Sequence, residues 1–307
     1  MLTGLLKVKY PLIQGGMAHI ATGKFAAKIS NAGALGVIAA GAMKPDQLEQ
    51  EIFECKKLTD APFGVNIMLL SPYKDELIDI VIKHKVSVVT TGAGNPGVYI
   101  DKLKTVGSLV IPVIPSVAFA RRVEKAGADA VIAEGTEAGG HIGELTTMAL
   151  IPQVVEAVKI PVIAAGGIAS GKQVVAAFAL GACGIQVGTC LLVSEECPIH
   201  QNYKDILIKA KDTDTVVTGR ISGIPVRIFK NKLAKTYITL EKEGKTKEEL
   251  EYFTLGALAK AVHEGDVDNG SVMMGQVAGM LKEIKPAKEI IAELFASARS
   301  ELQSLKI

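Results

Sequence analysis

The sequence lacks the features that mark several classes of protein. It has four cysteines in 307 residues (Cys55, Cys183, Cys190 and Cys197), and no two of them have the CxxC spacing of a zinc or redox motif. This usage predicts a reduced, cytoplasmic setting rather than a disulfide framework. The N-terminal segment is lysine-bearing and then strand-like, so no signal peptide is expected.

The sequence also has no large excess of positive or negative charge and no long apolar run. The formal net charge is +2, which argues against a nucleic-acid binder, because such a protein needs a concentrated basic surface. Although 49% of the residues are hydrophobic, glycine and proline break them into runs far shorter than the ~20 residues that span a bilayer. The length suits one barrel-sized domain with an accessory piece, or two smaller domains.

The first two-thirds of the chain contains a regular alternation of apolar runs and amphipathic stretches. Apolar strands separated by helices indicate a parallel sheet covered on both faces. Eight such units predict an α/β fold, a (β/α)8 TIM barrel, while an open doubly wound sheet is the alternative. The predicted strands lie in 11–17, 35–41, 62–69, 87–94, 109–116, 130–135, 161–167 and 184–189.

The alternation stops after Val193. Residues 196–269 are more charged and contain a helical stretch, KTKEELEYF, and an extended one, GIPVRIFKN. We expect a smaller, partly helical cap domain inserted after strand 8, with a flexible appendage as the alternative. The barrel domain is then 1–195 with 270–307, and the apolar stripe of 286–306 predicts the helix that closes it.

Active sites of such barrels lie at the carboxyl ends of the strands, where His141 is the strongest acid/base candidate. It ends the stretch AVIAEGTEAGGH, in which Gly139 and Gly140 let the backbone pack against a flat ligand. A lone histidine is more often structural, but this position favours a catalytic role. The strand ends offer no lysine for a Schiff base and no carboxylate cluster, so no metal site is predicted.

Glycine-rich turns follow the seventh and eighth predicted strands, where barrels of this kind often bind phosphate. Gly166-Gly167 and Gly188-Thr189 would offer backbone N–H groups and a hydroxyl, although glycines also simply make tight turns. GAGNPG (92–97) matches a dinucleotide fingerprint but has no acidic residue ~20 positions later. We therefore interpret it as a barrel loop after strand four.

The segment RISGIPVRIFKNKLAK carries five basic residues and no acidic one. A solvated face is the default interpretation of such a run. The sharper hypothesis is a docking patch for an acidic carrier or a phosphorylated substrate tail. The residues concerned are Arg220, Arg227, Lys230, Lys232 and Lys235.

Four motifs resemble one enzyme family over nearly the whole chain. IAEGTEAGGHIGELTTM, VTTGAGNP, PFGVNIMLLSP and GDVDNGSVMMGQVAG are similar to the FMN-dependent enoyl-acyl-carrier-protein reductases (reductase II) of bacterial fatty-acid synthesis. The wider superfamily includes nitronate monooxygenases, also called 2-nitropropane dioxygenases. EAGGHxG is common to both branches, whereas LLSP, TTGAGNP and GHIGxLTTM favour the reductase.

The resemblance implies FMN at the barrel mouth, NADH or NADPH as co-substrate with NADH preferred, and a homodimer, and it suggests a monovalent cation. His141 matches the catalytic histidine. One departure is Cys190, which stands where the family often has arginine. The implied cofactor residues are Gly16, Met17, Asn66, Thr91, Glu134, Gly139, Gly140, Ala165, Gly166, Gly167, Gly188, Thr189, Met274, Gly275 and Gln276.

Three functions stay open at this point. The resemblance favours reduction of a trans-2-enoyl group on acyl carrier protein by a hydride relay from NAD(P)H through FMN. The second is a nitronate monooxygenase that uses the same FMN and His141 with O2. The third is a non-catalytic barrel that binds phosphate or flavin. An enzyme like IMP dehydrogenase is not expected, because the loop after strand six has no cysteine.

Overall fold

The computed structural model describes residues 2–305 and contains the closed parallel barrel that the sequence predicts. The sheet order is β1-β9-β8-β6-β5-β4-β3-β2, and Leu35, directly before β2, exchanges backbone hydrogen bonds with β1, which closes the ring. The strands are β1 (Leu12–Gln14), β2 (Gly36–Ala39), β3 (Phe63–Met68), β4 (Val88–Gly92), β5 (Leu109–Ile114), β6 (Val131–Glu134), β8 (Val162–Ala165) and β9 (Gly184–Val187).

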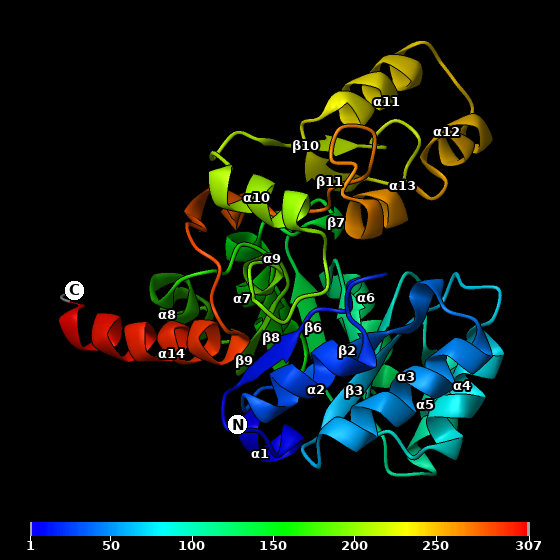
Figure 1. Cartoon of the computed structure of the whole chain (residues 1–307). Coiled ribbons are helices and arrows are strands. Elements are labelled where there is room, and N and C mark those ends of the chain that lie inside the picture. The colour runs from blue at the N-terminus through cyan, green and yellow to red at the C-terminus, as the bar shows by residue number, and fades with distance from the viewer. Residues whose placement is uncertain (1, 306–307) are drawn as a thin grey trace.

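Helices follow the strands and form the outer layer (Figure 1). Three of them begin at a serine or threonine whose hydroxyl accepts a hydrogen bond from a first-turn N–H, at Thr22, Ser116 and Ser170. The helices are α2 (Gly23–Asn31), α3 (Pro45–Leu58), α4 (Lys74–Lys83), α5 (Gly97–Lys104), α6 (Val117–Lys125), α7 (Thr147–Ala157), α8 (Gly171–Ala179) and α9 (Thr189–Leu192), with a 3-10 turn η1 (Ala40–Ala42).

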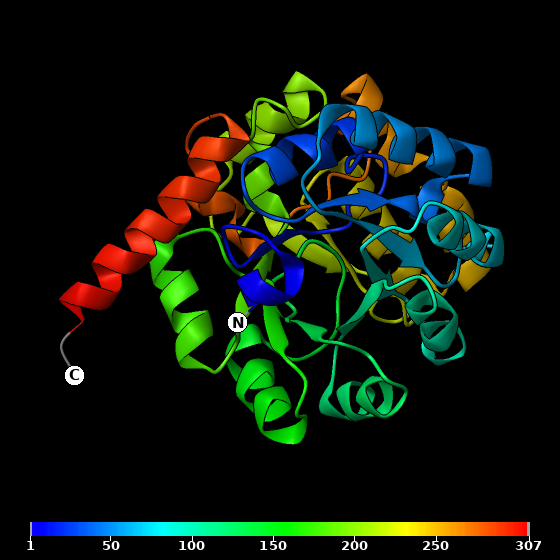
Figure 2. The same cartoon turned by 90° about the horizontal axis from the view of Figure 1, so that it is seen from below.

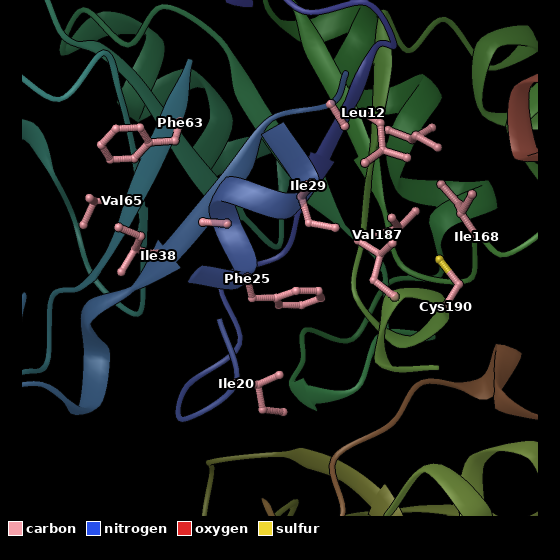
Figure 3. Close-up of a cluster of buried hydrophobic side chains, with 14 of the residues drawn as sticks. Leu12, Ile20, Phe25, Ile29, Ile38, Phe63, Val65, Ile168, Val187 and Cys190 are labelled. Carbon is pink, nitrogen blue, oxygen red and sulfur yellow. The ribbon is translucent and has the colours of Figure 1, made fainter. Parts of the chain in front are cut away.

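Alternation along the strands builds two apolar layers from one sequence, because neighbouring side chains point to opposite faces. The inner cluster fills the barrel axis with residues such as Ile13, Val37 and Ile132, while the outer cluster packs against the helices. In Figure 3, Phe25 and Ile29 of α2 lie among strand residues of the outer cluster. Both layers are buried, which explains why the strands read as apolar throughout.

The amino-terminal end of the barrel is covered by α1 (Leu2–Leu6), whose Leu2 and Leu6 join the inner cluster. Figure 2 shows this helix across the lower end of the ring. The predicted closing helix is α14 (Ala287–Ser304), which packs on α8 and buries Ile291 and Leu294. No helix within residues 2–305 combines the length and apolar character needed to cross a membrane.

Residues 196–269 lie over the carboxyl-terminal end of the barrel (Figure 1). Their core is an antiparallel ribbon that packs against two helices through Ile228, Leu233 and Ala257. The predicted extended piece is β11 and the predicted charged helix is α12. This part holds α10 (Gln201–Lys209), β10 (Thr215–Thr218), β11 (Val226–Phe229), α11 (Lys232–Lys242), α12 (Lys247–Thr254), α13 (Ala257–Ala259) and a π-helical turn η2 (Lys260–Glu264).

The ribbon has a third strand that comes from the barrel. The short β7 (Gly140–His141), in the loop between β6 and α7, pairs antiparallel with β11. After η2 the chain returns to the barrel through the 3-10 turn η3 (Gln276–Met280) before α14. The strand β7 of the loop that carries His141 and the strands β10 and β11 of the cap therefore form one three-stranded sheet.

Candidate functional site

A cavity of about 510 Å³ opens at the carboxyl ends of the barrel strands, next to α13 of the cap. Its walls are strand ends, the loop between β6 and α7, Leu258, and the returning segment that includes Met273 and Gly275. Most residues predicted from the sequence meet here. They are Gly16, Met17, Asn66, Glu134, Gly139, Gly140, His141, Ala165, Gly166, Gly167, Gly188, Thr189 and Gly275.

Thr91, which the resemblance assigns to the cofactor, is not among the residues that line the cavity. Val88 belongs to the inner cluster and Val89 to the outer one, so alternation directs Thr90 to the barrel axis and Thr91 to the helices. Thr90 Oγ1 donates a hydrogen bond to Oδ1 of Asn66 (2.9 Å), which lines the cavity. A shift of one residue exchanges the two faces of a strand, so the threonine that contacts the cavity residue Asn66 is Thr90 rather than Thr91.

Of the three residues predicted in the returning segment, only Gly275 is among those that line the cavity. Met274 is fully buried in the outer core, and Gln276 is exposed and meets the site only through its backbone. Met273 and Gly275 line the cavity instead. The segment is extended there, so successive side chains point in opposite directions, and the pattern SVMMGQ does not show which methionine faces inward.

The turns after β8 and β9 form an end of the cavity that suits an anion. Gly166 and Gly167 have φ values of +90° and +73°, a backbone conformation that glycine adopts at least cost. Within residues 2–305, the N–H groups of Gly166, Gly167 and Gly188 donate to no protein acceptor. Unpaired N–H groups that converge at strand ends are typical of phosphate sites.

Thr189 and Cys190 follow that turn and have different surroundings. Thr189 Oγ1 accepts a hydrogen bond from the N–H of Gly275 (2.9 Å), which leaves the hydroxyl proton for a further acceptor. Cys190 is buried beside Ile168 and Val187 (Figure 3), and burial raises the pKa of its thiol to about 12. It therefore supplies no charge to the cavity in place of the arginine that the family often has.

Glu137, which the sequence analysis did not select, connects the cavity wall to the barrel. Its carboxylate accepts hydrogen bonds from the N–H and hydroxyl of Thr147 at the start of α7, at 2.9–3.0 Å. Its carbonyl oxygen accepts from the N–H of Gln276 (2.9 Å). The signal in the sequence was an acidic residue in the loop before a helix, because a carboxylate is stabilised at a helix N-terminus.

Gly139 lies where this loop touches the returning segment. A Cβ at Gly139 would lie 2.6 Å from the carbonyl carbon of Met274 and 2.7 Å from the nitrogen of Gly275. No side chain fits at that distance without moving the backbone. The glycine is therefore needed for contact between two segments of the protein, in addition to any contact with a flat ligand.

His141 is exposed in the cavity wall, and its backbone is held by the cap. Val226 of β11 is its partner in the sheet, and the N–H of the next residue, Ile142, donates to the carbonyl of Pro225 (3.1 Å). Within residues 2–305 the imidazole makes no side-chain hydrogen bond. Surrounding protein displaces water from the ring and lowers its pKa, so the neutral imidazole dominates at pH 7.

Glu134 ends β6 and lines the same cavity. Burial raises the pKa of its carboxyl to about 7, because the charged form loses solvation there. The cavity thus holds two titratable groups whose pKa values are shifted in opposite directions, upward for Glu134 and downward for His141. Such displaced groups in a cleft are typical of functional sites.

Apolar side chains that the sequence analysis did not select also line the cavity. They include those of Ile20, Met68, Ala93 and Leu258. Met68 could have been found, because it is two residues beyond Asn66 on β3 and faces the same way. Leu258 comes from the cap, and no local pattern directs it to the barrel.

The basic segment does not form the single patch that was predicted. Arg227 is buried, and its guanidinium donates to the carbonyl of Thr136 and to Thr215 Oγ1. Arg220 is exposed and forms an ion pair with Glu144 (2.9 Å). Three lysines, Lys230, Lys232 and Lys235, remain on the surface, and Lys230 donates to the carbonyl of Thr213.

Fold and cavity together define a TIM-barrel protein with a cavity at the carboxyl ends of its strands, lined by glycine-rich turns and by apolar side chains. The chain belongs to the nitronate monooxygenase family, whose model matches residues 1–77 and 71–297. The resemblance stated from the motifs is thereby confirmed at the level of the superfamily.

Three relatives extend this result. The structure of FabK from Thermotoga maritima superposes with a TM-score of 0.96 at 49% identity, covering 99% of this chain and 97% of that one. A probable nitronate monooxygenase from Staphylococcus saprophyticus is 41% identical over 75% of this chain and 78% of its own length. A (3aS,4S,5R,7aS)-5-hydroxy-7a-methyl-1-oxo-octahydro-1H-indene-4-carboxyl-CoA dehydrogenase from Rhodococcus jostii is 32% identical over 99% and 97%.

Proposed function

We propose that this protein is an FMN-dependent enoyl-acyl-carrier-protein reductase that uses NADH, or NADPH as the alternative donor. The observation that carries the proposal is one cavity that joins an anion-binding turn, a neutral histidine and an apolar wall. These parts suit a phosphorylated planar cofactor and an acyl thioester. The 49% identity to FabK supports the reductase branch over the rest of the family.

The residues fit FMN in their chemistry. Gly166, Gly167, Gly188 and Thr189 would hold its phosphate through the N–H groups and hydroxyl described above. Gly139 and Gly140 leave the wall of the cavity without side-chain bulk. When bound, FMN would take a hydride equivalent from NADH and deliver it to the β-carbon of the enoyl thioester. The other cavity residues that we assign to the cofactor are Gly16, Met17, Asn66, Glu134, Ala165 and Gly275.

We assign to His141 the stabilisation of the negative charge that forms during the reaction and the transfer of a proton. Addition of hydride at the β-carbon places negative charge on the thioester oxygen, and the α-carbon must then gain a proton. A neutral imidazole can donate a hydrogen bond to that oxygen, while its protonated form can give a proton to the α-carbon, return to neutral imidazole and regain the proton from water. The lowered pKa of His141 keeps the imidazole neutral at pH 7.

We assign residues 196–269 to a cap that covers the bound acyl group, with the barrel formed by 1–195 and 270–307. Leu258 of α13 contributes an apolar side chain to the lining of the cavity. The acidic carrier protein would dock on the exposed basic side chains Arg220, Lys230, Lys232 and Lys235. Arg227 has no part in docking, because it is buried.

Anaerobic stopped-flow spectroscopy tests this function. We expect NADH to bleach the flavin absorbance of the purified protein, and crotonyl thioester to restore it. Absence of bleaching by NADH and NADPH, together with flavin reduction by an alkyl nitronate, would reject the reductase.

A nitronate monooxygenase is the second candidate, favoured by the 41% identity to the Staphylococcus saprophyticus relative. The same cavity would hold the nitronate, and His141 would act on the substrate as a base. O2 would then be the oxidant and no nicotinamide would be needed. The stopped-flow experiment separates the two candidates, because only the reductase requires rapid reduction by NADH.

A further inference from the structure

The buried guanidinium of Arg227 lies behind the loop that carries His141. Its Nε and Nη2 both donate to the carbonyl oxygen of Thr136, at 3.1 and 3.0 Å, and Nη1 donates to Thr215 Oγ1 (3.2 Å). Thr136 begins the loop, and its own N–H donates to the carbonyl of Leu145 near the end of the loop (2.8 Å). Arg227 thus holds the base of the loop to the cap ribbon.

Arg227 and His141 stand on neighbouring strands and point in opposite directions. In the antiparallel register Arg227 is opposite Gly140, and His141 is opposite Val226. Directly paired residues share a face of the sheet, and successive residues alternate. The imidazole therefore projects from the face opposite to that of the guanidinium, and Arg227 is not among the residues that line the cavity.

The charge of Arg227 has no carboxylate partner within 4.0 Å among residues 2–305. Burial of a charged group is unfavourable unless hydrogen bonds compensate for the lost water, and here a backbone carbonyl and a hydroxyl supply them. A neutral side chain would pack at this position without that requirement. The arrangement therefore maintains a specific geometry of the loop.

We propose that Arg227 is the positioning residue for His141, and that it couples the place of the catalytic histidine to the place of the cap. The assignment of catalysis to His141 rests on the proposed function, but the coupling itself does not. Movement of β11 displaces Thr136 through the guanidinium and displaces the His141 backbone through the strand pairing. The loop and the cap ribbon then move as one body.

The test compares Arg227→Met, Arg227→Lys and the control Arg121→Met in the flavin-bound protein. Arg121 is an exposed arginine of α6 in the barrel wall, and it belongs neither to the cavity lining nor to the basic residues assigned to docking. We expect Arg227→Met to lower kcat on the order of 10²-fold, since small displacements of a catalytic group have effects of that size. KM for crotonyl thioester should change much less.

A second readout does not depend on turnover. The pKa of His141, followed by NMR in histidine-labelled protein, should rise toward its ordinary value in Arg227→Met, because a released loop admits water to the imidazole. Arg227→Lys keeps the charge but cannot direct two donors to Thr136, so it should give an intermediate kcat and pKa. Arg121→Met should match the wild type in both.

Unchanged kcat and His141 pKa in a folded Arg227→Met protein would overturn the proposal. If Arg227→Met does not fold, the decision passes to Arg227→Lys, for which values equal to the wild type would overturn it. A wild-type protein that fails to reduce crotonyl thioester would reject the proposed reaction, and the NMR comparison would still decide the coupling.

Discussion

The carboxyl group of Glu134 should make the stability of this protein depend on pH in one direction. Burial raises its pKa from 4.5 to about 7. An acid whose pKa is higher in the folded state binds its proton more tightly when the chain is folded. The free energy of unfolding is therefore unaffected by this group below the unfolded pKa of 4.5, falls as the pH rises from there to about 7, and is constant above.

The size of the effect follows from the displacement. It amounts to about 2.5 pKa units at about 1.36 kcal/mol each, so ionisation of Glu134 costs ~3 kcal/mol of folding free energy at high pH. Water in the cavity reaches part of the side chain, which makes this figure an upper bound. Glu134→Gln removes the proton equilibrium and keeps nearly the same shape, so its stability lacks this decrease.

The assay is urea unfolding of flavin-free protein, followed by circular dichroism between pH 5 and pH 8.5. The Gln variant should gain stability over the wild type as the pH rises, by up to about 3 kcal/mol, while other titrating groups cancel in the difference. Met68→Leu lines the same cavity without a titratable group and should show a constant difference. Parallel pH curves for the wild type and Glu134→Gln would refute the reasoning.

Three further changes test the site. His141→Ala should lower turnover by ~10²–10⁴-fold with flavin still bound, and near-normal turnover would make the histidine structural. Gly139→Ala should cost about 1–3 kcal/mol and weaken flavin binding, because the new Cβ would meet the backbone at Met274; an unchanged Tm and flavin Kd would contradict this. Lys232→Glu with Lys235→Glu should raise KM for the carrier-bound substrate but not for a short thioester, and equal effects on both would remove docking from these lysines.

The barrel could be predicted from the sequence because each of its strands carries a complete local signal. A run such as LVIPVIPS is apolar on both faces and ends in a capping serine, Ser116, so strand, turn and helix start are all visible. Eight repetitions of that unit leave few topologies. The glycine turns after β8 and β9 were found for the same reason, because each directly follows a strand that can be recognised in the sequence.

The sequence was least informative about the side of a strand on which each side chain lies, whereas it indicated correctly which segments form the barrel strands. Thr90 and Thr91 are chemically equivalent on paper, and only the register of β4 with its neighbours separates them. Arg227 was grouped with surface lysines by sequence proximity, although β11 places it on the buried side of a ribbon. Alternation along a strand separates its side chains into two sets, but it does not show which set is buried. That assignment requires the partner strands to be known.

His141 shows the limit most clearly, because the residue was identified but its support was not. The two residues of β7 have no strand signal of their own and become a strand only by pairing with β11, which follows much later in the chain. A strand of that length is not stable without its partner. The position of the imidazole is therefore a property of the cap as much as of the barrel, so substitutions in β11 that leave the barrel intact should still alter the chemistry at His141.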